Sequence, residues 1–217
     1  MSARIVPLVA PEVLGCPTVM VRQQIVKAAV ELCRSAKVWE GELDDITVVS
    51  DTRDYTLVAV IGTTGEGEET VNITAPISEI TEVSLDGAPL TGTTLPDLRY
   101  RYEDWRSEIG TPELYLRMSP TTLSLVPTPT AGGTLGVMVT LRPDLASQTL
   151  EDFLVTEYSD ILAAGAKYFL MVMLGQKWSN PAMAAYYQEQ FYSSIGAASV
   201  AASGGNVGAP IRVKPCV

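Results

Sequence analysis

The sequence predicts an α+β protein, with an antiparallel helical bundle core, a large all-β insertion and an extended C-terminal arm. Apolar residues recur at three- and four-residue steps near residues 17–37 and again after residue 150, which is typical of helices that bury one face. Short β-branched and aromatic segments, separated by turn residues, fill the region between them. With 217 residues and 47% hydrophobic content, the chain can bury a substantial core. We expect these divisions: 1–16, N-terminal arm; 17–39 and 150–200, helical core; 40–149, β-rich insertion; 201–217, C-terminal arm.

The first helix is expected to begin at Pro17 and to run to about Lys37. Before it, Pro7 and Pro11 oppose helix formation, so residues 1–16 are expected to be extended. The charged side chains of the helix fall largely outside its apolar stripe, which predicts an amphipathic helix. The stripe consists of Val21, Ile25, Ala28, Ala29, Leu32 and Ala36.

Short strands are predicted from about Glu40 to Leu145, forming a small sandwich or barrel. Asp86-Gly87 predicts a two-residue hairpin turn between Glu82–Leu85 and Ala88–Leu90. Leu123–Val126 and Thr134–Leu141 are expected to form a second hairpin across the longer turn Pro127–Gly133. The other predicted strands are Ile46–Val49, Tyr55–Ile61, Thr70–Thr74, Ile80–Leu85 and Glu113–Arg117. Tyr100, Tyr102 and Trp105 lie in a charged stretch that predicts a short helix or an irregular loop.

Two further helices are predicted at residues 150–174 and from Pro181 to about Ala198, joined by a tight corner. Gly175 is expected to end the first of them. Asn180 can accept a hydrogen bond from a free backbone N–H, and Pro181 loses nothing at the first helical position. Trp178 lies on the corner, where we expect it to lock the turn or to contact a neighbouring subunit.

The C-terminal arm combines a Gly- and Ser-rich hinge with an apolar, basic end. It holds Arg212 and Lys214 but no acidic residue, although the chain as a whole has a net charge of −10. Such a segment is not expected to fold alone. It suits a subunit that inserts an arm into a neighbour, the other interpretation being a disordered terminus.

Composition excludes several classes of function. The chain has no histidine, which removes the usual general base and the commonest metal ligand. Net acidity argues against a nucleic-acid reader, and the three cysteines form no CxxC pair. No enzyme motif, metal site or cofactor site is predicted, and the acidic residues from Glu40 to Asp54 are interpreted as a solvated edge. The most apolar run, Ile161–Leu174, is too short to span a membrane.

Several short fragments follow one another along the chain in a recognisable order: Ala36-Lys37-Val38-Trp39, Val83-Ser84-Leu85-Asp86-Gly87-Ala88-Pro89-Leu90, Trp105, Gly110-Thr111-Pro112, Leu123-Ser124-Leu125-Val126-Pro127, Lys177-Trp178-Ser179-Asn180-Pro181 and Ala185-Tyr186-Tyr187. In this order they resemble the head-to-tail adaptor (connector) proteins of tailed bacteriophages. The resemblance covers roughly residues 12–198.

The resemblance implies a structural virion protein, made in the host cytoplasm and without catalytic activity. Such adaptors form a ring, commonly of twelve copies, below the portal protein. The ring lets DNA pass and carries the tail or nozzle protein. By position, the arm that reaches the portal would be Gly204–Val217, with Pro210, Ile211, Arg212, Val213 and Lys214 as its contact residues.

An alternative from another class remains open at the level of the sequence. The chain could be an intracellular ligand-binding or regulatory module without catalytic activity. A deep pocket lined by Tyr100, Tyr102 and Trp105 would favour that function.

Overall fold

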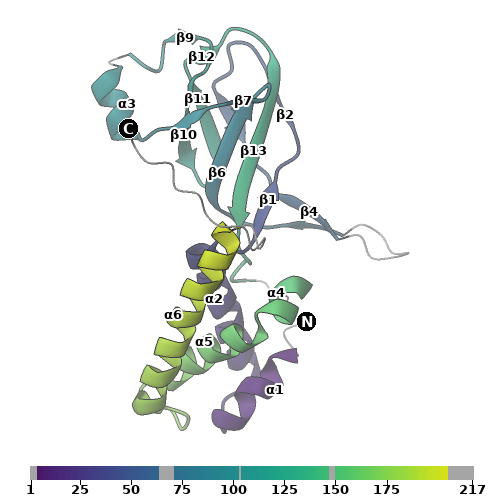
Figure 1. Cartoon of the computed structure of the whole chain (residues 1–217), viewed down its shortest axis with the longest axis vertical. Coiled ribbons are helices and arrows are strands. Elements are labelled where there is room, and N and C mark those ends of the chain that lie inside the picture. Colours follow the sequence, from purple (N-terminus) through teal and green to yellow (C-terminus); the bar gives the residue numbers. More distant parts are fainter. Residues whose placement is uncertain (1–3, 64–70, 103, 147–149, 205–217) are drawn as a thin grey trace. The chain divides into compact units, whose positions relative to one another are not determined.

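The computed structural model describes residues 4–63, 71–102, 104–146 and 150–204, and it is an α+β protein (Figure 1). The chain divides into two compact units. One consists of the described residues within Met1–Trp39 and Arg142–Val217, and its regular elements are helices. The other, Glu40–Leu141, is built mainly of strands.

Three long helices form the centre of the helical unit: α2 (Thr18–Ala36), α5 (Ser159–Met171) and α6 (Pro181–Ser203). All three contact one another (Figure 1). The predicted stripe of α2 is buried in full, because those side chains pack against α5 and α6. At Gly165 the helices approach so closely that an added Cβ would lie 2.8 Å from the Ala28 Cβ and 2.6 Å from the Phe191 ring.

The N-terminal segment differs from the extended arm that the prolines suggested. Residues Val6–Val9 form the short helix α1 and Ala10–Glu12 form the 3-10 turn η2, each with a proline in its first turn. Proline is accepted there because the first turn of a helix has no internal partner for its N–H groups. Ile5, Val9 and Val13 are buried in the helical core, so the segment is a packed part of this unit.

The last helices also differ in detail from the prediction. The segment expected as one helix is divided at Tyr158 into α4 (Asp152–Glu157) and α5. Helix α5 ends at Met171, before Gly175, which instead adopts a positive φ of 78° within the following turn. Helix α6 continues to Ser203, five residues beyond the predicted end.

The β unit contains two larger sheets. The first has the order β1-β13-β6-β7, with β2 also paired to β13, and all its pairs are antiparallel. The second has the order β3-β11-β10-β8. The strand bounds are β1 Glu40–Glu42, β2 Ile46–Val48, β6 Ile77–Leu85, β7 Ala88–Pro89 and β13 Gly133–Leu141, then β3 Asp54–Thr56, β8 Thr91–Gly92, β10 Leu114–Ser119 and β11 Thr122–Val126.

Two strand pairs and one helix complete this unit. Strand β4 (Val60–Thr63) pairs with β5 (Val71–Thr74), and β9 (Ile109–Gly110) pairs with β12 (Thr128–Pro129). The predicted strand Tyr55–Ile61 is therefore two strands, β3 and β4, which belong to different sheets. Helix α3 (Leu95–Arg101), which is labelled in Figure 1, follows β8 in the sequence.

One predicted hairpin is confirmed and the other is wrong. Asp86 and Gly87 both have positive φ, 50° and 81°, and place Leu85 opposite Ala88. This matches the turn type that an Asp-Gly pair favours in a two-residue hairpin. By contrast, β11 pairs with β10 and β3, whereas β13 pairs with β1, β2 and β6. The long turn thus connects two sheets, because alternating apolar residues specify a strand but do not choose its partner.

Candidate interaction surfaces

The predicted helix start at Asn180 is confirmed. Its side-chain oxygen accepts a hydrogen bond from the Met183 backbone N–H at 3.3 Å, and Pro181 occupies the first position of α6. The Asn180 N–H donates to the Met171 carbonyl at 3.0 Å, which ties the end of α5 to the start of α6. Trp178, two residues before Asn180, is half-buried and packs against the helical core.

A polar network that the sequence did not predict joins the N-terminal segment to α5 and α6. Lys167 Nζ donates to Glu12 Oε1 at 2.6 Å, and the Tyr187 hydroxyl donates to Glu12 Oε2. The Lys167 ammonium also lies 4.9 Å from the centre of the Tyr187 ring. Lys167 in the middle of an apolar helix was the one sequence signal of this network, because a buried ammonium requires a partner.

The two acids of this network have shifted pKa values. Burial by itself would raise the pKa of Glu12, but the Lys167 ammonium and the Tyr187 hydroxyl outweigh it and hold the pKa below its usual range. Burial, followed by the hydrogen bond to Glu12, raises the pKa of Tyr187 to about 12. Glu12 is therefore charged and Tyr187 neutral at neutral pH, which suits a structural clamp.

A groove of about 340 Å³ lies beside this network, between α1, α5 and α6. Leu8, Asp160, Tyr186 and Gln190 contribute to its walls. The lining contains no cysteine or histidine, and across the described part of the chain no cluster of metal-ligating side chains occurs. The groove therefore offers apolar, charged and hydroxyl contacts for a peptide or a side chain.

Helix α6 has an outer face that is uncovered and nearly uncharged. Glu189 is the single charged residue among the 23 of this helix, yet only four of its residues are buried: Ala184, Tyr187, Phe191 and Ile195. We use the name α6 outer face for its exposed large side chains, which are Met183, Tyr186, Tyr192 and Val200. Helices that are apolar around most of their circumference are usually buried.

In the β unit, Trp105 is part of the core rather than the wall of a ligand pocket. It is only 3% exposed, and the guanidinium groups of Arg53 and Arg106 lie 5.3 and 4.8 Å from its ring. Tyr100, on α3, is 90% exposed. The pocket beside Tyr102 measures about 150 Å³ and includes neither of the other two aromatic residues. This pocket is smaller than the 300–1,000 Å³ usual for ligand pockets. The three aromatic residues do not line one deep pocket, which is the feature that would favour the alternative function.

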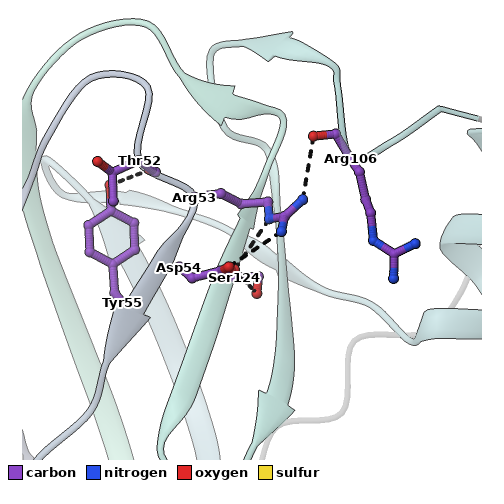
Figure 2. A network of polar contacts seen from close by, with 6 residues as sticks. All are labelled: Thr52, Arg53, Asp54, Tyr55, Arg106 and Ser124. Atoms are coloured by element: carbon purple, nitrogen blue, oxygen red, sulfur yellow. Dashed lines mark hydrogen bonds and ion pairs between the residues drawn. The ribbon is translucent and has the colours of Figure 1, made fainter.

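A polar network joins Asp54 of β3, Ser124 of β11 and the Arg106 carbonyl through Arg53 (Figure 2). Arg53 binds both carboxylate oxygens of Asp54, at 3.2 and 3.3 Å, and donates to the Arg106 carbonyl at 3.4 Å. The buried Ser124 hydroxyl donates to Asp54 at 2.5 Å, and Arg53, followed by Ser124, holds the pKa of Asp54 low. Next to this network, the Tyr55 hydroxyl donates to the Thr52 carbonyl at 2.6 Å. Asp54, interpreted from the sequence as part of a solvated edge, is therefore structural.

Residues Pro210, Ile211, Arg212, Val213 and Lys214 of the predicted arm lie outside the described residues. Among the described helices, none combines the length and hydrophobicity needed to cross a membrane.

Comparison with protein families decides the identity of the chain. The family model described as SU10 adaptor protein matches residues 10–214. The chain belongs to this adaptor family. This confirms the resemblance to phage head-to-tail adaptors and extends it over most of the chain. A search among curated proteins finds no match.

The two units of this adaptor differ sharply in charge. Residues 40–141 hold 17 of the 25 acidic residues and only five of the 15 basic ones, which gives that unit a net charge of −12. Residues 1–39 together with 142–204 hold eight of each sign. The two remaining positive charges, Arg212 and Lys214, are in the C-terminal arm. The acidity of the adaptor is therefore a property of its β unit alone.

Proposed function

We propose that this adaptor forms a homo-oligomeric ring, commonly of twelve copies in its family, below the portal protein of a tailed phage. The ring joins the DNA-filled head to the tail or nozzle protein and lets DNA pass. The family match over residues 10–214 is the observation that carries this proposal. The protein then acts as a structural part of the virion. Residues 17–39 and 150–200 are its helical core, 40–149 its β-rich insertion and 201–217 its arm.

The α6 outer face supports contact between subunits. A 23-residue helix with one charged residue leaves Met183, Tyr186, Tyr192 and Val200 in water when the chain is alone. Full burial of an exposed apolar side chain stabilises a contact by roughly 1.5–3 kcal/mol, and these side chains, which are 36–68% exposed, each supply a part of that. A closed ring requires two different complementary faces on each subunit, and the α6 outer face serves as one of them.

The charge of the β unit supports passage of DNA without binding. Nucleic-acid affinity comes largely from neutralised phosphates, and a unit with net charge −12 offers few cations for this purpose. A wall of this composition therefore repels the phosphate backbone. We therefore expect that the adaptor does not bind DNA even at low salt, where any electrostatic attraction is strongest.

The arm is proposed to dock on the portal through Pro210, Ile211, Arg212, Val213 and Lys214. The test mixes the full-length adaptor with purified cognate portal rings and measures co-sedimentation. A variant lacking Gly204–Val217 should lose binding, and Arg212→Glu/Lys214→Glu should weaken it. Undiminished binding by both variants would refute the role of the arm.

The ring itself is tested by native mass spectrometry and electron microscopy of the adaptor with and without portal. We expect closed rings in the presence of the portal, and Tyr186→Glu/Tyr192→Glu should prevent them. Because both tyrosines are exposed, this variant should keep the far-ultraviolet circular dichroism of the parent. An adaptor that remains monomeric on portal rings would contradict the proposal.

A further inference from the structure

Strand β1 is an open edge of the larger sheet. It pairs with β13 on one side, and within the described part of the chain no strand pairs with its other side. The Leu43 N–H donates to the Val137 carbonyl at 2.9 Å, which sets the alternation of the ladder. Gly41 then directs its backbone groups toward β13, whereas Glu40 and Glu42 direct theirs outward. Two residues on this edge are thus available to pair with an added strand.

The side chains along β1 define what such a strand should carry. Glu40 and Glu42 are exposed, and they lie on one face of the sheet, opposite Thr140 and Met138. On the other face, Gly41 leaves the edge without a side chain. A Cβ added there would lie 3.5 Å from Leu141 Cδ1, an ordinary contact distance. The edge therefore suits a strand with two cations on one face and an apolar side chain between them on the other.

The C-terminal arm carries this pattern. Arg212 and Lys214 alternate with Ile211 and Val213, and Pro210 and Pro215 bracket the four residues. In an extended strand, both cations lie on one side and both β-branched residues on the other. The residue before a proline favours extended backbone, and a proline cannot donate a hydrogen bond to the strand ladder. Pro210 and Pro215 therefore limit the strand to Ile211–Lys214, close to the three residues of β1.

We propose that, before the portal is bound, the open edge of β1 binds residues Ile211–Lys214 of a second copy of this chain as an added antiparallel strand; docking on the portal then requires the arm to leave this edge. The strand places Arg212 opposite Glu42, Lys214 opposite Glu40 and Val213 opposite Gly41. Antiparallel pairing is chosen because every pair in this sheet is antiparallel. Main-chain hydrogen bonds supply the affinity, and the two cross-strand ion pairs supply the specificity. Each chain is then donor to one neighbour and acceptor of another.

The proposal does not depend on the portal, since both partners are segments of this chain. The test therefore leaves the portal out, and its failure would not affect the adaptor role. A trace of full-length protein with Cys16→Ser is labelled with a fluorophore at Cys216, two residues after the proposed strand. Cys33 is buried and should not react. Unlabelled full-length protein is then added as the acceptor, and fluorescence anisotropy is measured.

Anisotropy should rise with the concentration of unlabelled acceptor. A Glu40→Lys/Glu42→Lys acceptor should bind about tenfold more weakly, because two favourable cross-strand pairs become like-charge pairs. Labelled donor with Arg212→Glu/Lys214→Glu should restore binding to that acceptor. As a matched control, Asp104→Lys/Glu108→Lys changes two other exposed acids of the same unit and should leave binding within twofold.

A synthetic peptide of residues 209–215 tests the main-chain pairing. In the proposed register the Arg212 N–H points to β1 and the Val213 N–H points away. N-methylation at Arg212 should abolish competition with the labelled arm, whereas N-methylation at Val213 should preserve it. Equal binding by the charge-reversed and parent acceptors would overturn the proposal. So would an anisotropy that is independent of added acceptor, because it would show that the arm binds its own chain or nothing.

Discussion

Replacing Gly165 by alanine tests whether α2, α5 and α6 meet as closely as the structure indicates. The new Cβ would lie 2.6 Å from Phe191 Cε2 and 2.8 Å from the Ala28 Cβ, well inside the contact distance of about 3.5–4.0 Å. Overpacking of this kind costs about 1–3 kcal/mol. Alanine is also a better helix former than glycine by about 0.8–1 kcal/mol, which offsets part of that cost. We expect a net loss of about 0–2 kcal/mol in the free energy of unfolding.

Gly196 provides the matched control. It lies in α6, its backbone φ is unexceptional, and an added Cβ would have nothing within 4 Å. Gly196→Ala should therefore gain up to about 1 kcal/mol from helix propensity alone. The two variants carry the same chemical change, so the difference between them reports only the packing at Gly165.

Urea unfolding followed by circular dichroism at 222 nm measures both variants. Protein concentration is kept equal, because any assembly adds stability by mass action. The expected difference between the variants is the overpacking cost of about 1–3 kcal/mol, which corresponds to roughly 2–12 °C in Tm for a chain of this size. Equal stabilities, or a more stable Gly165→Ala variant, would refute the close approach of the three helices.

Three further predictions concern the helical unit. The pKa of Glu12 is lower in the folded chain than its ordinary value of 4.5, so its contribution to stability is present above that pH and is lost as pH falls through the folded value. Glu12→Gln should remove that acid-side loss in urea titrations, and an unchanged pH profile would contradict the contact with Lys167. Burial raises the pKa of Cys33 to about 12, so a thiol reagent should modify Cys33 only after unfolding and Cys16 before it, as peptide mass spectrometry can show. Trp178→Ala should lower Tm or block ring assembly, and loss of neither would exclude its role at the corner.

Several local features were predictable because their causes lie within a few residues. The buried stripe of α2 follows from its three- and four-residue period. The Asp86-Gly87 turn follows from the ease with which those residues adopt positive φ, and the start of α6 follows from the Asn180 side chain. The prediction of an extended N-terminal arm was wrong because it considered proline only in a helix interior. Pro7 and Pro11 are poor in a helix interior but acceptable in the first turns that they occupy here.

The polar networks could not be predicted from residue patterns. Glu12 and Lys167 are 155 residues apart, and Asp54 and Ser124 are 70 apart. Apart from Lys167, which interrupts an apolar helix, these side chains have an ordinary sequence context. A carboxylate acquires a structural role only when the fold places it beside a specific partner. No local sequence pattern specifies that partner.

By itself, the sequence determined the kinds of local element, the uneven distribution of charge and the family. These depend on composition, period and the order of short fragments. The tertiary structure alone decided that β11 and β13 enter different sheets, that the N-terminal segment packs on the helices, and that none of the described strands covers the outer edge of β1. The physical reason is that strand pairing and burial are contacts between distant segments. Many partners satisfy the same alternating pattern, and the choice among them depends on packing of the whole unit.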